Sequence, residues 1–147
     1  MGKSTKVSNV PNAPAFSAYA NAATSLATGA QTKVSFQVED FDTNSNFSSS
    51  RFTPTVAGYY QVNARIQFSG SATNPLAYIQ KNGTQVLCGQ YIPGTFSGPV
   101  ATVSGLVYLN GTTDYVECFG YHVTGSSVNT NAAQDATRFD GCLVRPA

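Results

Sequence analysis

FTPTVAGYYQVNARIQF, residues 52–68, is the stretch of sequence that decides the fold. After Gly58 every second side chain is apolar, and these residues are Tyr60, Val62, Ala64, Ile66 and Phe68. The side chains between them are almost all polar, and these are Tyr59, Gln61, Asn63, Arg65 and Gln67. Because successive side chains of a strand point to opposite faces of a sheet, the alternation predicts an antiparallel strand with one face in the core.

Similar short runs occur along the rest of the chain, and none has the sustained apolar spacing of a long helix. Asn82-Gly83 separates two such runs and predicts a hairpin, because a type I′ turn needs positive φ at both positions. Asn110-Gly111 marks a second turn. About eight to ten short strands separated by turns indicate an all-β, antiparallel sandwich or jelly roll. Further strands are expected at 15–20, 33–41, 76–81, 84–88, 101–109, 115–123 and 138–144.

The length and charge of the chain limit its organisation and its partners. With 147 residues, it is expected to form one domain over 13–147 after a polar segment at 1–12. Charged residues make up only 10% of the chain and the net charge is +1, so nucleic acid and acidic lipid are not expected partners. No apolar stretch approaches the about 18 residues of a membrane span, so no membrane insertion is expected. The polar but uncharged composition suits an exposed extracellular or virion protein.

Four segments, taken in chain order, resemble the globular head domain of complement component 1q. They are AFSA at 15–18, RFTPTVAGYY at 51–60, KNG at 81–83 and TRFDGCLV at 137–144. That domain is a trimeric jelly roll related to the tumour-necrosis-factor fold. The run beginning at Phe52 is most similar to copies of the domain found at the ends of bacteriophage tail fibres and in bacterial surface proteins. The chain departs from the family in a longer turn at 109–116 and in Cys142, where the family usually has an aromatic residue.

The resemblance implies a homotrimeric, antiparallel jelly roll with no enzymatic activity. It further implies a binding module of a virion appendage, such as a phage tail fibre, that attaches to a host surface receptor, for example a glycan. The alternative is a secreted bacterial or invertebrate adhesion or lectin-like protein of the same fold. In the family the strand at 52–68 lies on the inner sheet, whose other face approaches the trimer axis. The polar residues of that strand are therefore the expected trimer interface, namely Tyr59, Gln61, Asn63, Arg65 and Gln67.

Catalytic chemistry is not expected from these residues. The only histidine, His122, shares a strand parity with Val116 and Cys118 and is interpreted as a packed or hydrogen-bonded structural side chain. Its distance from Cys118 along an extended strand is about 13 Å, which is too far for a catalytic dyad. A glycan-modifying enzyme would need two carboxylates about 5–10 Å apart. The seven acidic residues make such a pair hard to assemble.

No metal or other cofactor is expected either. The three cysteines, Cys88, Cys118 and Cys142, form no C-x-x-C pair and are interpreted as free thiols that pack as small apolar side chains. Asp40 and Asp42 could share a strand face and bind calcium through oxygen atoms, although a solvated loop edge is the favoured interpretation.

Receptor contacts are expected in three loops, at 42–51, 89–99 and 125–136. Each of the first two loops contains aromatic residues that could stack on sugar rings, namely Phe47, Tyr91 and Phe96. For each of these side chains, however, a place in the core or in the trimer interface is the favoured interpretation.

Overall fold

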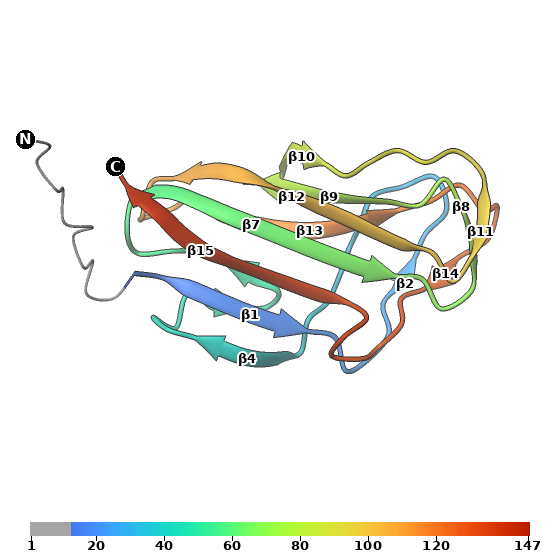
Figure 1. The fold of residues 1–147 in the computed structure, drawn as a ribbon, viewed down its shortest axis with the longest axis horizontal. Coiled ribbons are helices and arrows are strands. Elements are labelled where there is room, and N and C mark those ends of the chain that lie inside the picture. The colour runs from blue at the N-terminus through green and yellow to red at the C-terminus, as the bar shows by residue number, and fades with distance from the viewer. Residues whose placement is uncertain (1–12) are drawn as a thin grey trace, which may run out of the picture.

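Residues 13–147 are described by a computed structural model, in which they form strands and no helix (Figure 1). The polar segment expected at 1–12 lies outside the described residues. The strands are β1 (Ala15–Tyr19), β2 (Ser25–Leu26), β3 (Thr32–Lys33), β4 (Val38–Asp42), β5 (Phe47–Ser48), β6 (Arg51–Phe52), β7 (Gly58–Gln67), β8 (Ser71–Thr73), β9 (Leu76–Lys81), β10 (Thr84–Cys88), β11 (Thr95–Ser97), β12 (Val100–Leu109), β13 (Val116–Tyr121), β14 (Val128–Asn129) and β15 (Arg138–Pro146).

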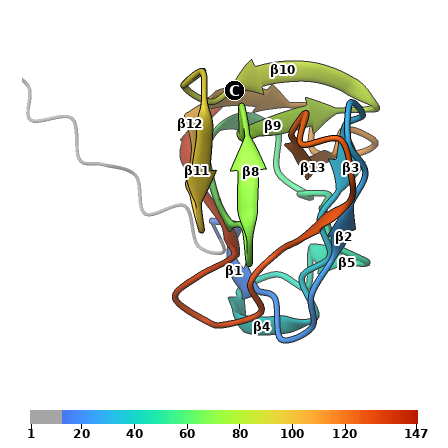
Figure 2. The same cartoon turned by 90° about the vertical axis from the view of Figure 1, so that its right-hand side faces the viewer.

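Two antiparallel sheets pack face to face and form a sandwich (Figures 1 and 2). The first has the strand order β12-β7-β15-β1-β4, and the second has the order β10-β9-β13-β6-β5, with β3 beside β13. Two short pairs, β11-β8 and β14-β2, lie at one end of the sandwich. Neighbouring strands such as β1 and β15 come from opposite ends of the chain, as in a jelly roll. The predicted all-β antiparallel sandwich is confirmed.

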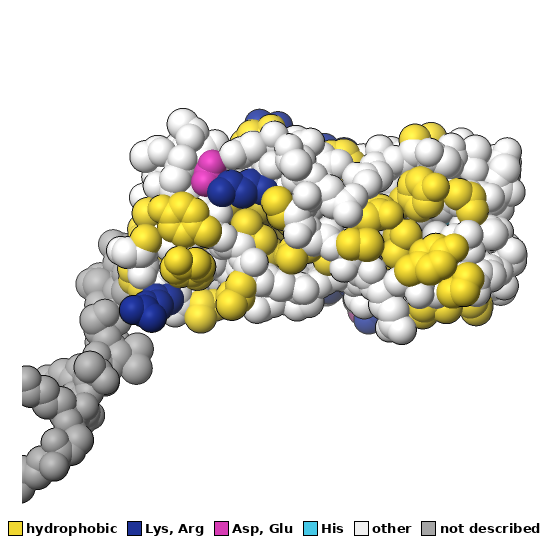
Figure 3. Space-filling view, turned by 90° about the horizontal axis from the view of Figure 1, so that it is seen from above, with side chains coloured by type: hydrophobic (Ala, Val, Ile, Leu, Met, Phe, Trp, Pro, Cys, Tyr) yellow, Lys and Arg dark blue, Asp and Glu magenta, His cyan; other side chains and the backbone are white. Residues whose placement is uncertain are grey.

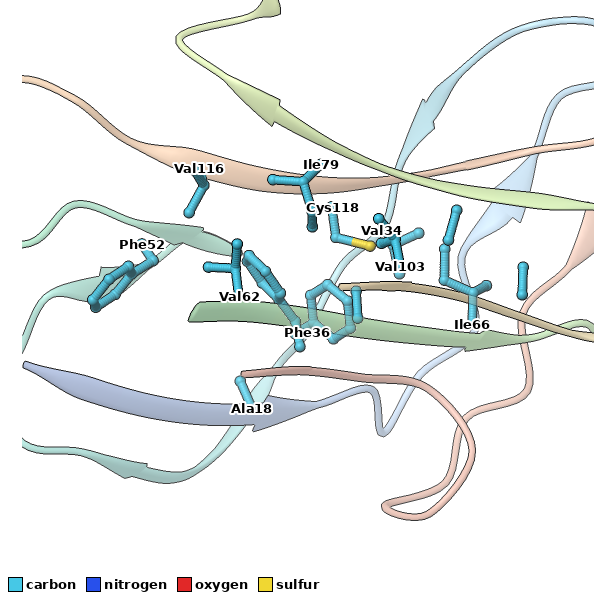
Figure 4. Close-up of a cluster of buried hydrophobic side chains, with 14 of the residues drawn as sticks. Ala18, Val34, Phe36, Phe52, Val62, Ile66, Ile79, Val103, Val116 and Cys118 are labelled. Carbon is cyan, nitrogen blue, oxygen red and sulfur yellow. The ribbon is translucent and has the colours of Figure 1, made fainter. Parts of the chain in front are cut away.

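Strand β7 lies between β12 and β15 in the five-stranded sheet and has the predicted alternation. Its apolar side chains, from Tyr60 to Ile66, are at most 4% exposed and face the six-stranded sheet. The Tyr60 hydroxyl, which would be costly to bury without a partner, donates a 2.6 Å hydrogen bond to the carbonyl oxygen of Val56. Burial raises the pKa of Tyr60 to about 12. Side chains of both sheets meet in the core shown in Figure 4.

Aromatic rings fill the core at the end of the sandwich where β1 begins. The ring of Phe16 is stacked on Phe52 at 4.3 Å and on Phe47 at 4.9 Å, and it meets Phe139 edge-on at 4.9 Å. These four side chains come from β1, β6, β5 and β15 and are at most 6% exposed. Their packing joins the two sheets at this end.

The single strand expected at 33–41 is instead two strands in different sheets. β3 pairs with β13 in the six-stranded sheet, whereas β4 pairs with β1 in the five-stranded sheet. Between them the chain crosses the core, and Val34 and Phe36 are buried there. The apolar alternation of residues 33–41 does indicate buried side chains. Part of it, however, belongs to an extended crossover between the two sheets and not to a strand.

The two Asn-Gly turns differ in conformation. Asn82 and Gly83 have φ values of 52° and 79°, as the type I′ prediction requires. At the second turn only Gly111 has positive φ, and the side chain of Asn110 organises the loop. Its Oδ1 accepts hydrogen bonds from the backbone N–H groups of Thr112, Thr113 and Asp114, at 2.9–3.0 Å. This turn runs from the end of β12 at Leu109 to the start of β13 at Val116.

Candidate functional site

The five-stranded sheet has one face in the core and one face open to solvent, which we call the outer face. All five residues predicted at a subunit interface lie on this outer face, along β7. None of the five is buried, and Tyr59 is 48% exposed. The structure thus brings these residues together on one accessible surface.

A band of hydrogen-bonded polar side chains crosses the middle of the outer face. Register pairs Ser104 of β12 with Asn63 of β7, and Asn63 with Asp140 of β15. Ser104 Oγ donates to Asn63 Oδ1 at 2.7 Å, and Asn63 Nδ2 donates to Asp140 Oδ1 at 2.8 Å. Gln61 Nε2 also donates to Ser104 Oγ at 2.8 Å. The band holds these polar side chains in fixed positions.

The neighbouring row contains two arginines directly opposite each other, Arg65 and Arg138. Arg138 Nη2 donates to Asp40 Oδ2 at 2.6 Å. Partial burial raises the pKa of the Asp40 carboxyl, but hydrogen bonds from Arg138 and Gln134 outweigh this and hold the pKa below its usual value of 3.8. The side chain of Arg65 is exposed and has no hydrogen bond or ion pair with any other described residue. The same holds for Arg145, which lies opposite Tyr59 on β15, so the outer face carries two arginine side chains without a partner in the described residues.

Four large apolar side chains gather on the outer face near the chain end at Ala147. We call them the terminal cluster, and they are Tyr59, Leu106, Tyr108 and Val144. They are 42–59% exposed, and the rings of Tyr59 and Tyr108 lie 5.5 Å apart. An open hollow beside them is lined by Tyr59, Leu106 and Val144 together with the last three residues. An exposed group of this kind indicates a contact surface.

The edge of the sandwich formed by β12 and β10 is closed by side-chain packing. Leu87 of β10 lies over Gly105 of β12, where a Cβ atom would come within 2.7 Å of a Leu87 methyl carbon. Viewed onto this edge, hydrophobic side chains gather toward both ends and charged side chains are few (Figure 3). The edge adjoins the outer face, because Leu106 and Tyr108 of the terminal cluster lie on β12.

The opposite end of the sandwich, which we call the loop end, is almost free of charge. It is formed by the loops at 20–31, 69–75, 89–99 and 123–137, away from the end where β15 finishes (Figure 1). Among these loop residues Asp135 is the one charged side chain. Ser, Thr, Asn and Gln supply most of the polar groups of the loop end.

Two of the three predicted receptor-binding aromatics lie at the loop end. Tyr91 and Phe96 are 56% and 39% exposed, in the loop between β10 and β12. Phe96 also lines a hollow of about 350 Å³ between this loop and β12, whereas Tyr91 does not line it. Apolar and uncharged polar residues line the hollow together, and no charged side chain lines it.

Phe47 is in the core, so the favoured core interpretation is confirmed and Phe47 is removed from the candidate receptor contacts. It is 6% exposed, lies on β5 and stacks on Phe16. The turns before and after it place Ser45, Ser49 and Ser50 at positive φ, which directs the chain back across the end of the core.

The thiols and the histidine have different environments. Cys118 is buried, and burial raises the pKa of its thiol. Cys88 and Cys142 are exposed, so the prediction that all three pack as apolar side chains is wrong for these two.

His122 is fully buried, with Nε2 3.0 Å from the carbonyl oxygen of Leu26 and Nδ1 2.9 Å from Thr124 Oγ1. It is a hydrogen-bonded structural side chain, as expected.

The two aspartates considered for calcium are engaged by protein groups. Asp40 accepts from Arg138, and Asp42 Oδ2 accepts a 2.6 Å hydrogen bond from the backbone N–H of Phe47. Within residues 13–147, no group of three or more Asp, Glu, His or Cys side chains is placed to hold a metal ion. That part of the chain also lacks any helix able to span a membrane.

A buried carboxylate, Glu117, was not singled out from the sequence. It is 5% exposed on β13 and accepts from Lys33 Nζ at 2.7 Å and from Arg51 Nε at 2.9 Å. The Arg51 guanidinium also lies 3.8 Å from the centre of the Tyr115 ring. These cations come from β3 and β6, so only the strand register could have revealed the cluster.

The sequence matches no protein-family model and no curated protein. Solved structures do match. The globular domain of zebrafish complement 1qA has 18% sequence identity and a TM-score of 0.62, with 92% of this chain and 99% of that chain covered. Murine APRIL at pH 5.0 has 10% identity and a TM-score of 0.67, with 90% and 99% covered. The Eiger TNF from S. frugiperda has 10% identity and a TM-score of 0.65, with 92% and 95% covered.

The likeness extends over almost the whole described chain and over almost the whole of each similar structure. At these identities it establishes the fold, which is the jelly roll shared by complement 1q globular domains and tumour-necrosis-factor-like proteins. The fold expected from the four short sequence segments is confirmed.

Proposed function

We propose that the chain is a non-enzymatic, homotrimeric binding module of a virion appendage, such as a phage tail fibre, which attaches the appendage to a host surface receptor. The observation that carries the proposal is the division of the surface into an open sheet face with an apolar cluster and a nearly uncharged loop end. The first suits association with copies of the chain, and the second suits contact with a ligand. The fold agrees with the trimer implied by the sequence resemblance.

The outer face and the β12–β10 edge fit a ring of subunits. A closed ring of three copies uses a heterologous contact, in which one surface of a subunit meets a different surface of the next. The chain offers the outer face with the terminal cluster and, adjoining it, the edge formed by β12 and β10 (Figure 3). Burial of the four exposed side chains of the terminal cluster would favour assembly.

The polar band would give this contact its orientation. Its side chains are already fixed by hydrogen bonds in the subunit, so little conformational entropy is lost when a neighbour packs against them. Arg65 adds a cation without a partner in the described residues, which a carbonyl or carboxylate oxygen of the neighbour would satisfy. The predicted interface residues thus have different roles, and Arg65 is the most specific of them.

The loop end would face the receptor. β1 begins and β15 finishes at the opposite end of the sandwich, so attachment of the appendage at that end would present the loop end outward (Figure 1). Three copies of the loop end lie side by side in a trimer, and weak contacts then combine through avidity.

Native mass spectrometry and a host-adsorption assay test the proposal together. We expect a trimer at micromolar concentration, and we expect fluorescently labelled trimer to bind host cells and to compete with the intact virion. A stable monomer at that concentration would contradict the trimer, and a trimer that neither binds cells nor competes would contradict the attachment role. Degradation of host polysaccharide by the purified protein would contradict the absence of enzymatic activity.

A further inference from the structure

We propose that Arg65 of one subunit pairs with Asp140 of the next subunit, so that three identical ion pairs close the ring of the trimer. The inference rests on the proposed function, because it assumes that the outer faces of three copies surround one axis. It goes further in naming the two side chains that meet and the surface that receives the arginine.

The two sides of the outer face carry different groups (Figure 1). We call β12 and β7 the β12 side, which carries Arg65, and we call β15, β1 and β4 the β4 side, which carries Asp140. When three copies of one sheet face surround an axis, each contact joins one side of a subunit to the other side of the next, since a three-fold contact is heterologous. The β12 side of one subunit therefore meets the β4 side of its neighbour.

Asp140 lies in an open hollow on the β4 side. Phe41, Asn63 and Ser17 line this hollow as well, and the strand register places them in one row with Asp140 across the sheet. Oδ1 of Asp140 accepts the 2.8 Å hydrogen bond from Asn63, whereas Oδ2 has no partner among the described residues. The ring of Phe41 is 52% exposed. A free carboxylate oxygen near an exposed aromatic ring suits a guanidinium group, which can pair with the first and stack on the second.

The ion pairs within the subunit leave Asp140 without a cation. Arg138 also lines the hollow, but its Nη2 donates to Asp40 Oδ2 at 2.6 Å. Asp140 itself forms no ion pair with any described residue. Each subunit thus has an unpaired cation, Arg65, on its β12 side and an unpaired carboxylate on its β4 side. These two sides are complementary in charge, and a guanidinium and a carboxylate form strong, charge-assisted hydrogen bonds.

Arg65 and Asp140 lie at similar heights along the sandwich. Asn63 is opposite Asp140 and two residues from Arg65, so the rows of Arg65 and Asp140 are about 7 Å apart along the strands. Rotation about an axis that runs along the strands preserves this difference, and a long side chain can span it. Arg145, the other arginine without a partner in the described structure, is opposite Tyr59. Its row is about 13 Å from that of Asp140, which is too far for a pair.

Carbodiimide coupling on the full chain tests the contact directly, because it joins an amine to a carboxylate in contact with it and leaves guanidinium groups unchanged. Arg65→Lys places an amine at this position. We expect covalent dimers and trimers on a denaturing gel, above the background of the unsubstituted protein. Mass spectrometry of peptides from these bands should find position 65 joined to Asp140. Arg145→Lys is the matched control and should give no link to Asp140, and combining Arg65→Lys with Asp140→Asn should abolish the link.

Substitutions measure what the pair contributes to assembly. Asp140→Asn removes the charge and keeps an oxygen that can accept from Asn63, and we expect it to raise the concentration at half-assembly by about tenfold or more. Asp135→Asn, at an exposed carboxylate of the loop end, is the matched control and should leave this concentration unchanged. Arg65→Glu combined with Asp140→Arg reverses the pair and should restore assembly to within about threefold of the unsubstituted protein. Circular dichroism shows whether each variant is folded.

Three results would overturn the inference. A link between position 65 and Asp140 found only in monomeric product would place the pair within one subunit. Equal assembly of Asp140→Asn and Asp135→Asn would show that the carboxylate of Asp140 is not at the contact, and failure of the reversed pair to assemble would show that the two side chains do not meet. An unsubstituted protein that is a trimer without this link leaves the proposed function standing and removes only the pair, whereas a stable monomer removes both.

Discussion

Arg65 and Arg138 lie directly opposite each other on β7 and β15, and Arg138 alone of the two has a carboxylate partner in the described structure. Like charges in this position disfavour strand pairing. Asp40 offsets the charge of Arg138, whereas Arg65 remains uncompensated within the described residues. The Arg65 side chain therefore destabilises the folded subunit. We expect it to stabilise the assembled trimer instead, by binding an oxygen atom of the neighbouring subunit.

Arg65→Glu should therefore separate folding from assembly. In the subunit the new carboxylate faces Arg138, and we expect the free energy of unfolding to stay unchanged or to rise by about 0.2–1 kcal/mol. In the trimer it replaces the cation that meets the neighbour, and we expect monomers at micromolar concentration. Sedimentation velocity and urea unfolding measure the two effects. Arg65→Lys, which keeps the charge, is the control, and a trimer that survives Arg65→Glu would remove Arg65 from the interface.

The terminal cluster gives a second test of the outer face. Leu106 is 57% exposed, so Leu106→Ser should change the stability of an isolated subunit by less than about 0.5 kcal/mol. We expect the same change to weaken assembly at least fivefold, because a buried apolar contact is lost in every subunit. Analytical ultracentrifugation across a dilution series measures this effect. Val123→Ser, at an apolar side chain of 38% exposure at the loop end, should leave assembly intact. Equal effects of the two substitutions would argue against the terminal cluster as an interface.

Most of the sandwich could be predicted because its long strands carry local patterns. The alternation in 52–68 placed β7, and Asn82-Gly83 placed the hairpin between β9 and β10. The stretch at 33–41 failed because apolar alternation is the same in a strand and in an extended crossover. Whether Val34 and Phe36 belong to one sheet or connect two depends on β13 and β1, which are distant in sequence.

The residues of the candidate sites could be predicted only where the alternation of polar and apolar residues along a strand shows which side chains are exposed. The outward residues of β7 were found, because the opposite parity was plainly apolar. The sequence left Phe47 as both a core residue and a receptor candidate, since its burial comes from Phe16 and Phe139, far from it in the sequence. The hollow beside Phe96 has no local signal, because it forms between a loop and β12.

A glycine pair tests the closure of the sandwich edge. A Cβ atom at Gly89 would overlap the carbonyl oxygen of Thr102, which is backbone and cannot rotate away. We expect Gly89→Ala to lower the free energy of unfolding by about 1–3 kcal/mol, because β10 and β12 must separate. Gly70→Ala is the matched control, since nothing lies within 4 Å of its Cβ position, and it should change stability by less than about 0.5 kcal/mol. Urea unfolding of both variants measures the difference. If the two variants had equal free energies of unfolding, β10 and β12 could separate at this edge at little cost in stability.

The cluster around Glu117 predicts how stability depends on pH. Burial by itself raises the pKa of Glu117, but hydrogen bonds from Lys33 and Arg51 outweigh it and hold the pKa below its usual value of 4.5. Because the pKa is lower in the folded state, the carboxylate stabilises the fold above about pH 4.5, and this contribution is lost as the pH falls through the folded-state pKa.

Glu117→Gln should therefore lower the free energy of unfolding at pH 7 by about 1–2 kcal/mol, a moderate value because both cations are partly exposed to solvent. The variant should also lose less stability than the unsubstituted protein between pH 5 and pH 3, as the titrating group is absent. Glu39→Gln, at an exposed carboxylate, should match the unsubstituted protein at pH 7. Urea unfolding at a series of pH values measures both effects. Parallel pH profiles for Glu117→Gln and the unsubstituted protein would show that the cluster does not control the acid response.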